Sequence, residues 1–409
     1  MPHLLKTPTP SSPGIVMFTH KERAFLHPSV PGMAALMTQL AQRYVIGMHW
    51  GSPHADVPPV PFVDFHLGGQ GTLSLRQPSP VPHFPLCSRN FLPPCFHHNP
   101  NIAKQWDILA VAGPRRLKRL DELLVVLRKV YDRRPETRVL IISACDNLAK
   151  RDPELDYVEL YDDYLRLFSD EERKRFTLMM LEGPSGMALP LETMAYFYNA
   201  SRTFTLFTNK EGESRVISEA LLCGVPVVVK RHLEGGGRDY LNETNSRQFG
   251  TLDEAAEQFL SLLSPNPPLQ FDTAPLMQAM SEPQTMPQLE AAMREVFAQK
   301  GLALEGQLDA TDLSFKLPGH YYLTLPPDLR QATSNDLRSP EAAYRFIAGL
   351  LGIPISGWQR WQLRQVGRWQ GLSQWAGRFL KRPSMTLRQQ GILPSRAPKR
   401  ATQPLLQPV

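Results

Sequence analysis

The chain has 409 residues and a mass of 46.2 kDa, which is too long for one ordinary domain and fits two or three. This length excludes a peptide hormone or a small disulfide scaffold, and the 42% hydrophobic and 21% charged content is typical of a globular protein. The net charge of +6 is unevenly spread, because residues from Ala342 onward carry 11 Lys and Arg and no acid. The preceding part is mildly acidic, and no nucleic-acid partner is expected.

Cysteine spacing and the distribution of apolar residues indicate in which cellular compartment the protein is located. The four cysteines are separated by 8, 50 and 78 residues, which is neither a zinc pattern nor a dense disulfide framework. The first residues contain no apolar core of signal-peptide length, and no run approaches the roughly 20 apolar residues of a spanning helix. These features predict a reducing, cytoplasmic setting. The cysteines are Cys87, Cys95, Cys145 and Cys223.

The N-terminal part begins as an α/β layer. Residues 1–13 are rich in Pro, Ser and Thr and are predicted to be disordered. The apolar run 14–20 predicts a buried strand, the segment 31–43 a helix, and the run 44–50 a second strand. Only one further strand-like piece, 61–67, is readable before residue 100.

From Trp106 the pattern becomes regular. The apolar run 107–112 and the run 138–143 predict strands, and apolar residues along one face between 120 and 131 predict the helix that connects them. Strands alternating with helices over this region predict a doubly wound parallel sheet. The further strands are 175–181, 203–207 and 225–229, and the further helices are 189–199, 215–223 and 252–263.

The C-terminal third is rich in Pro and basic residues. A proline-rich connector at 264–268 ends the regular region, and a helical piece is predicted at 286–299. After Glu341 a basic helical segment rich in Trp extends to about Lys381. Its amphipathic pattern fits an anionic membrane surface through residues 354–382, or alternatively a stripe of Trp packed across the two domains.

One loop carries the densest candidate chemistry. Ligands of parallel sheets bind at the carboxyl ends of the strands, where loops lead into helices. Glu211 lies in such a loop and Glu219 lies about one turn into the following helix, so two carboxylates can reach different parts of one ligand. Ionised carboxylates are acceptors suited to vicinal hydroxyls, and the unpaired amides around 213–216 can accept a phosphate.

Glu211, Gly212 and Glu219, followed by Ala-Leu-Leu-Cys-Gly-Val-Pro-Val-Val-Val, resemble the Glu-x7-Glu signature of retaining GT-B glycosyltransferases of the family 4 type, the glycosyl transferases of group 1. The resemblance implies that Glu211 contacts hydroxyls of the donor sugar and that Glu219 contacts the ribose of the nucleotide. It also implies donor binding by the residues between them. Those residues are Gly212, Ser214, Arg215 and Val216.

A second segment, 113–124, is similar to the family's Gly-Arg…Lys-Gly opening of the nucleotide-binding domain. Lys118 matches the lysine, Arg115 and Arg116 compete for the arginine, and Arg119 stands where the family has the second Gly. The resemblance implies that these cations neutralise the donor diphosphate. The turn at 233–241 is similar to the glycine turn of the family.

The chain also departs from the family pattern. Glu213 and Ser214 stand where the family commonly has an aromatic residue and a Gly, and Arg215 replaces an apolar residue. Because an extra acid near a phosphate site is unfavourable, Glu213 is expected to face solvent. Only about 100 residues precede the nucleotide-binding part, which predicts an abbreviated first domain.

The resemblance implies a GT-B-like α/β fold with two Rossmann-type domains, the N-terminal one abbreviated, plus C-terminal helices. The implied reaction moves a hexosyl group (EC 2.4) from a nucleotide-diphosphate sugar to a glycan or lipid-linked acceptor, with retention and without metal or cofactor, as in polysaccharide biosynthesis. Glu211, Lys118 and Arg116 are the catalytic candidates. The expected location is cytoplasmic, or peripheral on the inner membrane face.

The predicted division of the chain has six parts, and two other functions stay open. A catalytically inactive nucleotide-sugar or glycan-binding protein would keep the second domain, whereas a membrane-surface adaptor would act through the basic Trp-rich segment. The parts are a disordered N-terminus (1–13), a reduced acceptor-side domain (14–103), a nucleotide-sugar-binding domain (104–265), an irregular and helical extension (266–337), an amphipathic basic segment (338–382) and a disordered tail (383–409).

Overall fold

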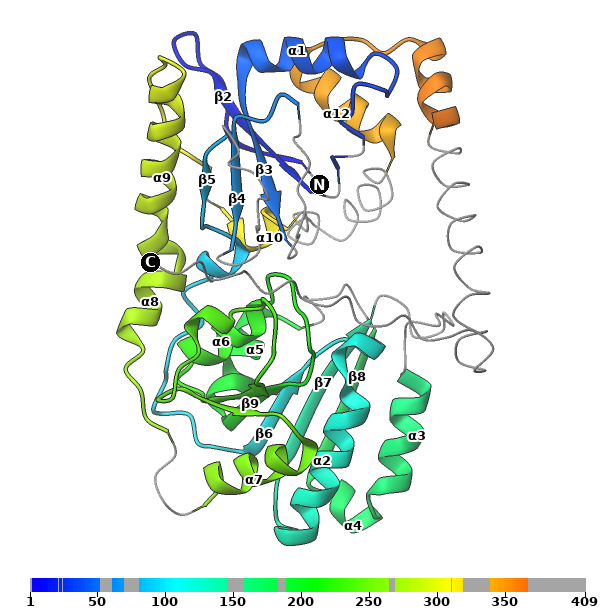
Figure 1. The fold of residues 1–409 in the computed structure, drawn as a ribbon, viewed down its shortest axis with the longest axis vertical. Helices are drawn as coiled ribbons and strands as arrows, with labels where there is room; N and C mark the ends of the chain where they lie inside the picture. Colours follow the sequence, from blue (N-terminus) through cyan, green and yellow to red (C-terminus); the bar gives the residue numbers. More distant parts are fainter. Residues whose placement is uncertain are drawn as a thin grey trace, which may run out of the picture.

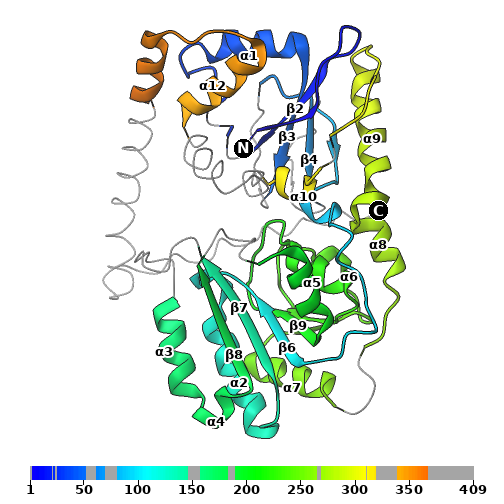
Figure 2. The ribbon, with the colours of Figure 1, turned by 180° about the vertical axis from the view of Figure 1, so that it is seen from behind.

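The computed structural model contains two α/β domains that face each other (Figure 1). Each domain has its own sheet, and helices from the C-terminal third run along both (Figure 2). The structure describes residues 2–20, 22–23, 25–51, 61–69, 81–145, 157–182, 189–264, 269–309, 311–318 and 339–366.

The second domain is built on a six-stranded, wholly parallel sheet. Its strand order, β11-β10-β9-β6-β7-β8, is the doubly wound order of a Rossmann fold. The sheet reverses direction of winding between β6 and β9, which are paired in parallel. The strands are β6 (Trp106–Val111), β7 (Val139–Cys145), β8 (Phe176–Glu182), β9 (Ser201–Leu206), β10 (Val227–Lys230) and β11 (Ser246–Phe249).

Helices cover both faces of this sheet, which explains why its central strands read as continuous apolar runs. The predicted doubly wound sheet is confirmed, with most boundaries within two residues. The sequence pattern missed α3, α4 and β11. The helices are α2 (Leu120–Arg133), α3 (Tyr157–Leu167), α4 (Asp170–Arg173), α5 (Leu191–Asn199), α6 (Arg215–Leu222) and α7 (Leu252–Leu262), with short 3-10 turns η2 (Arg116–Lys118) and η3 (Arg238–Tyr240).

The first domain has a five-stranded sheet in the order β1-β2-β3-β4-β5, parallel except for the antiparallel pair β1 and β2. Strand residues alternate between two cores, as the period of two demands. Ile15 and Met17 face one core, whereas Val16 and Phe18 face the other. The elements are β1 (His3–Lys6), β2 (Gly14–Thr19), α1 (Met33–Arg43), β3 (Tyr44–Trp50), β4 (Phe65–Gly68), β5 (His83–Phe84) and the turn η1 (Ser88–Asn90).

The N-terminal stretch supplies only a short domain, as predicted, and C-terminal helices complete it. One face of the sheet packs on α9 through Leu289, Met293 and Phe297, and the other face carries α1 with Ile347 of α12. Helices α9, α10 and α12 therefore belong to the first domain (Figure 1), whereas Leu276 and Met280 of α8 lie in the core of the second domain. These helices are α8 (Ala274–Met280), α9 (Glu282–Gln299), α10 (Leu313–Lys316) and α12 (Pro340–Leu351).

The prediction of disorder for residues 1–13 is wrong. His3–Lys6 form β1, which pairs with β2, and the Lys6 ammonium donates to the Ser12 hydroxyl at 3.2 Å and to the Pro13 carbonyl at 2.9 Å. Ser12 in turn donates to the Ala303 carbonyl at 2.9 Å. Composition suggested disorder because partners almost 300 residues away cannot be seen in a local window. The predicted disordered tail 383–409 lies outside the described residues.

Among the described residues, no helix has both the length and the apolar character that crossing a bilayer requires.

A bidentate ion pair fastens α4 to α2. Arg128 donates through Nη1 and Nη2 to the two carboxylate oxygens of Glu172, at 2.9 and 2.7 Å. These bonds lower the pKa of Glu172 from its ordinary value of 4.5 to about 2. A depressed carboxyl pKa contributes stability above the ordinary pKa and loses it as the pH falls through the folded value.

We predict that Glu172→Gln lowers the free energy of unfolding by about 1 kcal/mol at pH 7, since the pair is partly solvated. The difference between wild type and variant should narrow as the pH falls from about 4.5 towards 2. Urea unfolding of both proteins at a series of pH values measures it. A difference that stays constant with pH would refute the assignment.

Candidate functional site

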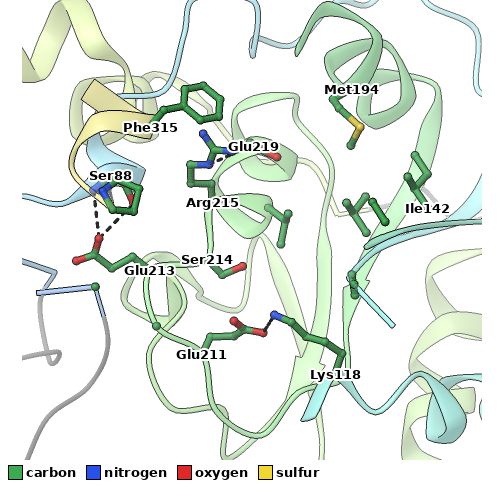
Figure 3. A pocket seen from close by; sticks show the side chains of 18 of the residues that line it. Ser88, Lys118, Ile142, Met194, Glu211, Glu213, Ser214, Arg215, Glu219 and Phe315 are labelled. Atoms are coloured by element: carbon green, nitrogen blue, oxygen red, sulfur yellow. Dashed lines mark hydrogen bonds and ion pairs between the residues drawn. The ribbon is translucent and has the colours of Figure 1, made fainter. Parts of the chain in front are cut away.

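A cleft of about 440 Å³ lies between the two domains. Its second-domain wall comes from the loops after β6 and β9 and from the start of α6, and its first-domain wall comes from the ends of β2 and β3, from η1 and from α10. Figure 3 shows side chains from both walls pointing into one space. The lining includes Lys118, Glu211 and Glu219, so the acid pair and the lysine share a cavity, as the sequence predicted.

The strand order explains why Lys118 meets Glu211. β6 and β9 are neighbours in the sheet, but their chains leave it in opposite directions. Their following loops therefore flank one crevice at the carboxyl edge. Lys118, which follows β6, donates to Oε1 of Glu211, which follows β9 (Figure 3). Both side chains are mostly removed from water, so the site holds one cation and one anion against each other.

A glycine turn supports the loop that carries Glu211. The Glu211 N–H donates to the Glu234 carbonyl at 2.8 Å, and the Gly236 N–H donates to the Gly212 carbonyl at 2.8 Å. A Cβ on Gly235 would lie 2.3 Å from the Glu211 carbonyl oxygen, and Gly235 has a φ of 71°. Only glycine permits this approach, which explains the glycine turn at 233–241.

Glu219 is buried and lines the cleft. Tyr198 donates its hydroxyl hydrogen to Oε2 of Glu219 at 2.9 Å, and Nε of Arg215 lies 3.7 Å from Oε1. Burial raises the pKa of the Glu219 carboxyl above its ordinary value, and Arg215 and Tyr198 offset part of that effect. The carboxylate is thus an acceptor held by one hydrogen-bond donor, Tyr198, and by the nearby cation of Arg215.

The start of α6 places further polar groups at the cleft. The N-cap residue Ser214 makes no side-chain capping hydrogen bond, so it leaves the first amides of the helix without a partner from its hydroxyl. Arg215 lies with its guanidinium carbon 4.0 Å from the centroid of the Phe315 ring (Figure 3). Gly212, Ser214, Arg215 and Val216 all line the cleft, and donor binding by these residues stays a prediction.

The two arginines of the first loop have different places. Arg115 lines the cleft, whereas Arg116 lies outside it with Nη2 3.9 Å from Glu159 Oε1 and 64% of its side chain exposed. The assignment of Arg116 as a catalytic residue is therefore not supported by its position. In the 3-10 turn η2, which has three residues per turn, Lys118 lies three positions after Arg115 and on the same side, whereas Arg116 is rotated away from them by about a third of a turn. Arg119 adopts the left-handed φ of 55° that the family's Gly would favour.

Glu213 does not face solvent as predicted. Its side chain is 2% exposed and reaches the first domain, where His49 Nε2 lies 2.8 Å from Oε2. The N–H of Gly69 donates to Oε1 at 3.2 Å, and the hydroxyl of Ser88 donates to Oε2 at 3.2 Å. The burial of this acid is compensated by donors that the local sequence cannot reveal.

Sequence reasoning missed the first-domain wall. His20, His49 and Gly51 follow or end β2 and β3, and Ser88 and Phe315 come from η1 and α10. The rule that ligands bind at carboxyl ends of strands, applied to the first sheet as well, would have found His20 and His49. Ser88 and Phe315 carried no such signal. Within the described ranges, no group of three or more His, Cys, Asp or Glu side chains is arranged to hold a metal ion.

No family model matches the chain, and no curated protein matches it in sequence. Solved structures to which this chain is similar include the GtfA/B complex, with 12% identity, 65% of this chain and 56% of that chain covered, and a TM-score of 0.46. The pneumococcal O-GlcNAc transferase GtfA in complex with UDP and GlcNAc is another, with 10% identity, 78% of this chain and 55% of that chain covered, and a TM-score of 0.40. Sucrose-phosphate synthase from Thermosynechococcus elongatus is a third, with 11% identity, 70% of this chain and 74% of that chain covered, and a TM-score of 0.44. The chain spans little more than half the length of the first two.

The Lys118–Glu211 pair predicts how the cleft handles anions. An anion that binds Lys118 must displace Glu211 and approach its negative charge. Glu211→Gln should therefore raise the affinity for inorganic pyrophosphate about tenfold, or about 1.4 kcal/mol, and Lys118→Met should lower it at least as much.

Isothermal titration calorimetry with pyrophosphate measures both effects. Glu243→Gln, which removes an exposed acid of the same domain, is the matched control and should leave the affinity unchanged. Equal or weaker binding by Glu211→Gln would show that Glu211 does not compete for the lysine.

Proposed function

We propose that the protein is a glycosyltransferase that moves a sugar from a nucleotide-diphosphate donor to an acceptor. The observation that carries the proposal is the meeting of Lys118, Glu211 and Glu219 in one cleft between two Rossmann-type domains. A cation, amides of a helix start and two separated carboxylates together match a donor that combines a diphosphate with two sets of hydroxyls.

The donor diphosphate lies beside Lys118, Arg115 and the first amides of α6 in this proposal. When the glycosidic bond breaks, negative charge develops on the leaving diphosphate. Cations and N–H groups already fixed around it stabilise that charge without reorganisation. Because these groups are part of the chain, the proposed reaction needs no metal ion or cofactor.

The two carboxylates bind opposite ends of the donor. Once the diphosphate engages Lys118, Glu211 is free to accept hydrogen bonds from hydroxyls of the transferred sugar. Glu219 accepts from the ribose, with Tyr198 and Arg215 holding its orientation. The remaining wall is apolar and suits the face of a nucleobase. It includes Ile142, Leu189, Leu191, Met194 and Val216.

The acceptor enters from the first domain, where His20, His49 and Gly51 line the opposite wall. We propose a glycan or lipid-linked acceptor and a cytoplasmic site of action. Retention of the anomeric configuration and a hexosyl donor follow from the resemblance of the Glu-x7-Glu segment to the family 4 type. Surface polysaccharide synthesis is the corresponding role.

A donor screen tests the proposal. Unfolding of the full chain is followed with UDP-, GDP- and ADP-sugars, and one series should raise the melting temperature, because a ligand at 100 times its Kd stabilises the folded state by about 2.7 kcal/mol. Glu219→Gln keeps an acceptor for Tyr198 but loses the charge, and should weaken the donor at least tenfold.

The control variant Glu243→Gln should respond like wild type. Absence of stabilisation by every donor would refute a nucleotide-sugar site. Release of nucleoside diphosphate with acceptor, and the anomeric configuration of the product by NMR, then separate retaining transfer from inversion. Donor binding without turnover would instead assign the inactive binding role.

A second candidate function rests on one exposed surface. Trp358 and Trp361 are 64% and 51% exposed and stack on each other with ring centroids 4.8 Å apart. They do not pack across the two domains, although α12 returns to the first domain beside α1. Exposed Trp beside arginine suits the headgroup region of an anionic membrane. The later Trp369 and Trp375 lie outside the described residues.

We predict that the double variant Trp358→Ser, Trp361→Ser reduces co-sedimentation with phosphatidylglycerol-containing vesicles at least threefold. Pure phosphatidylcholine vesicles are the control for charge, and Leu302→Ser is the control for loss of an exposed apolar side chain elsewhere. Unchanged binding would remove these two tryptophans from any membrane contact.

A further inference from the structure

We propose that Glu213 is a positioning residue, which ties the loop that carries Glu211 and opens α6 to the first domain. It rests on the proposed function for its effect on donor binding, but the tie itself is a property of the structure. The name "latch" is used below for Glu213 with its first-domain partners His49, Gly69 and Ser88.

In the latch, polar groups of the first domain lie within hydrogen-bond distance of a buried carboxylate. The carboxylate of Glu213 receives the Gly69 N–H at 3.2 Å, the Ser88 hydroxyl at 3.2 Å and the Ser88 N–H at 3.4 Å. His49 Nε2 lies 2.8 Å from Oε2, and the two side chains are 1% and 2% exposed. Each partner is at least 125 positions away in sequence, so the contact joins the domains and not one loop.

A charge so deeply buried needs this set of donors. An unpaired carboxylate at such a position would cost several kcal/mol, and the three hydrogen bonds from Gly69 and Ser88 offset part of that cost. The neighbouring thiol adds no competing charge, because burial raises the pKa of Cys87 well above its ordinary value and the Glu213 carboxylate raises it further. The burial of the Glu213 carboxylate therefore depends on polar groups of the first domain.

An ion pair between a buried arginine and a partly exposed aspartate lies on the same boundary. Arg89 of η1 donates to Asp239 of η3, and its guanidinium carbon is 5.4 Å from the centroid of the Tyr240 ring. The two contacts have the same polarity, because the second domain supplies the acid in both and the first domain supplies the polar partners. This arrangement favours one relative placement of the two domains.

The position of Glu213 in the loop makes the latch consequential. It is two residues after Glu211 and directly before Ser214, the N-cap of α6. Lys118 holds Glu211 on one side and Phe315 lies against Arg215 on the other (Figure 3). The segment 211–215 is thus fixed at three points, and the latch is the one that reaches the β3 end and η1. Donor-binding groups are set in place by the domain that faces the acceptor.

The first test needs no nucleotide. Amide hydrogen exchange of the full chain compares wild type with Glu213→Ala, and exchange in segments 67–69, 87–90 and 209–216 should accelerate at least tenfold in the variant. Glu213→Gln keeps one carbonyl acceptor and should give an intermediate acceleration. Glu243→Gln, an exposed acid on the same domain, should exchange like wild type.

Exchange that is unchanged in all three segments would overturn the latch. If Glu213→Ala does not fold, Glu213→Gln and Ser88→Ala carry the test, since each removes only part of the contact. A double-mutant cycle of Glu213→Gln with His49→Gln should show coupling in these exchange rates, whereas additive effects would assign the burial of Glu213 to packing alone.

The second test uses UDP as the probe, or GDP or ADP if only that one stabilises wild type. Loosening the loop should weaken the nucleotide at least tenfold in Glu213→Ala, with partial rescue in Glu213→Gln. Unaltered affinity beside accelerated exchange would overturn the positioning role. If wild type binds no nucleotide, the donor proposal fails, and the exchange experiment still decides the latch.

Discussion

The parallel pairing of β6 with β9 is the constraint on which the site depends. These strands are adjacent in space but 95 residues apart at Trp106 and Ser201, and their chains diverge to opposite halves of the sheet. No helix can cover the crevice where they part, so two loops meet there with their side chains facing each other. Lys118 and Glu211 form an ion pair because of this topology, whatever ligand the cleft receives.

Contacts within the protein compensate the charged groups that the cleft removes from water. Lys118 and Glu211 neutralise each other, Glu219 is held by Tyr198 and Arg215, and Glu213 by the first domain. Each of these three carboxylates therefore has a polar partner within the protein. A ligand with both anionic and hydroxyl groups can replace the first pair as a unit, which avoids leaving either charge alone.

The parts of the fold that repeat locally could be predicted, and the parts that depend on distant partners could not. The βαβ pattern from Trp106 and the glycine turn at 235–237 are local, and both were found. The strand β1 was missed because four residues next to prolines give no periodicity, although β2 pairs with it. The predicted orientation of Glu213 was wrong because its donors, Gly69 and Ser88, lie in segments that have no motif of their own.

The same division separates the two domains. The second domain closes its core within one continuous stretch, whereas the first needs α9 and α12, whose contacts with β2 and α1 span roughly 270 to 330 positions. The cleft shows the same difference between its walls, because Phe315 on α10 lies far along the chain from the strands of the first domain. The second-domain wall of the cleft is therefore assembled from one continuous stretch of chain, and the opposing wall only when both ends of the chain meet. Through the contact between Glu213 and His49, the first-domain wall positions the loop of the second domain that carries Glu213.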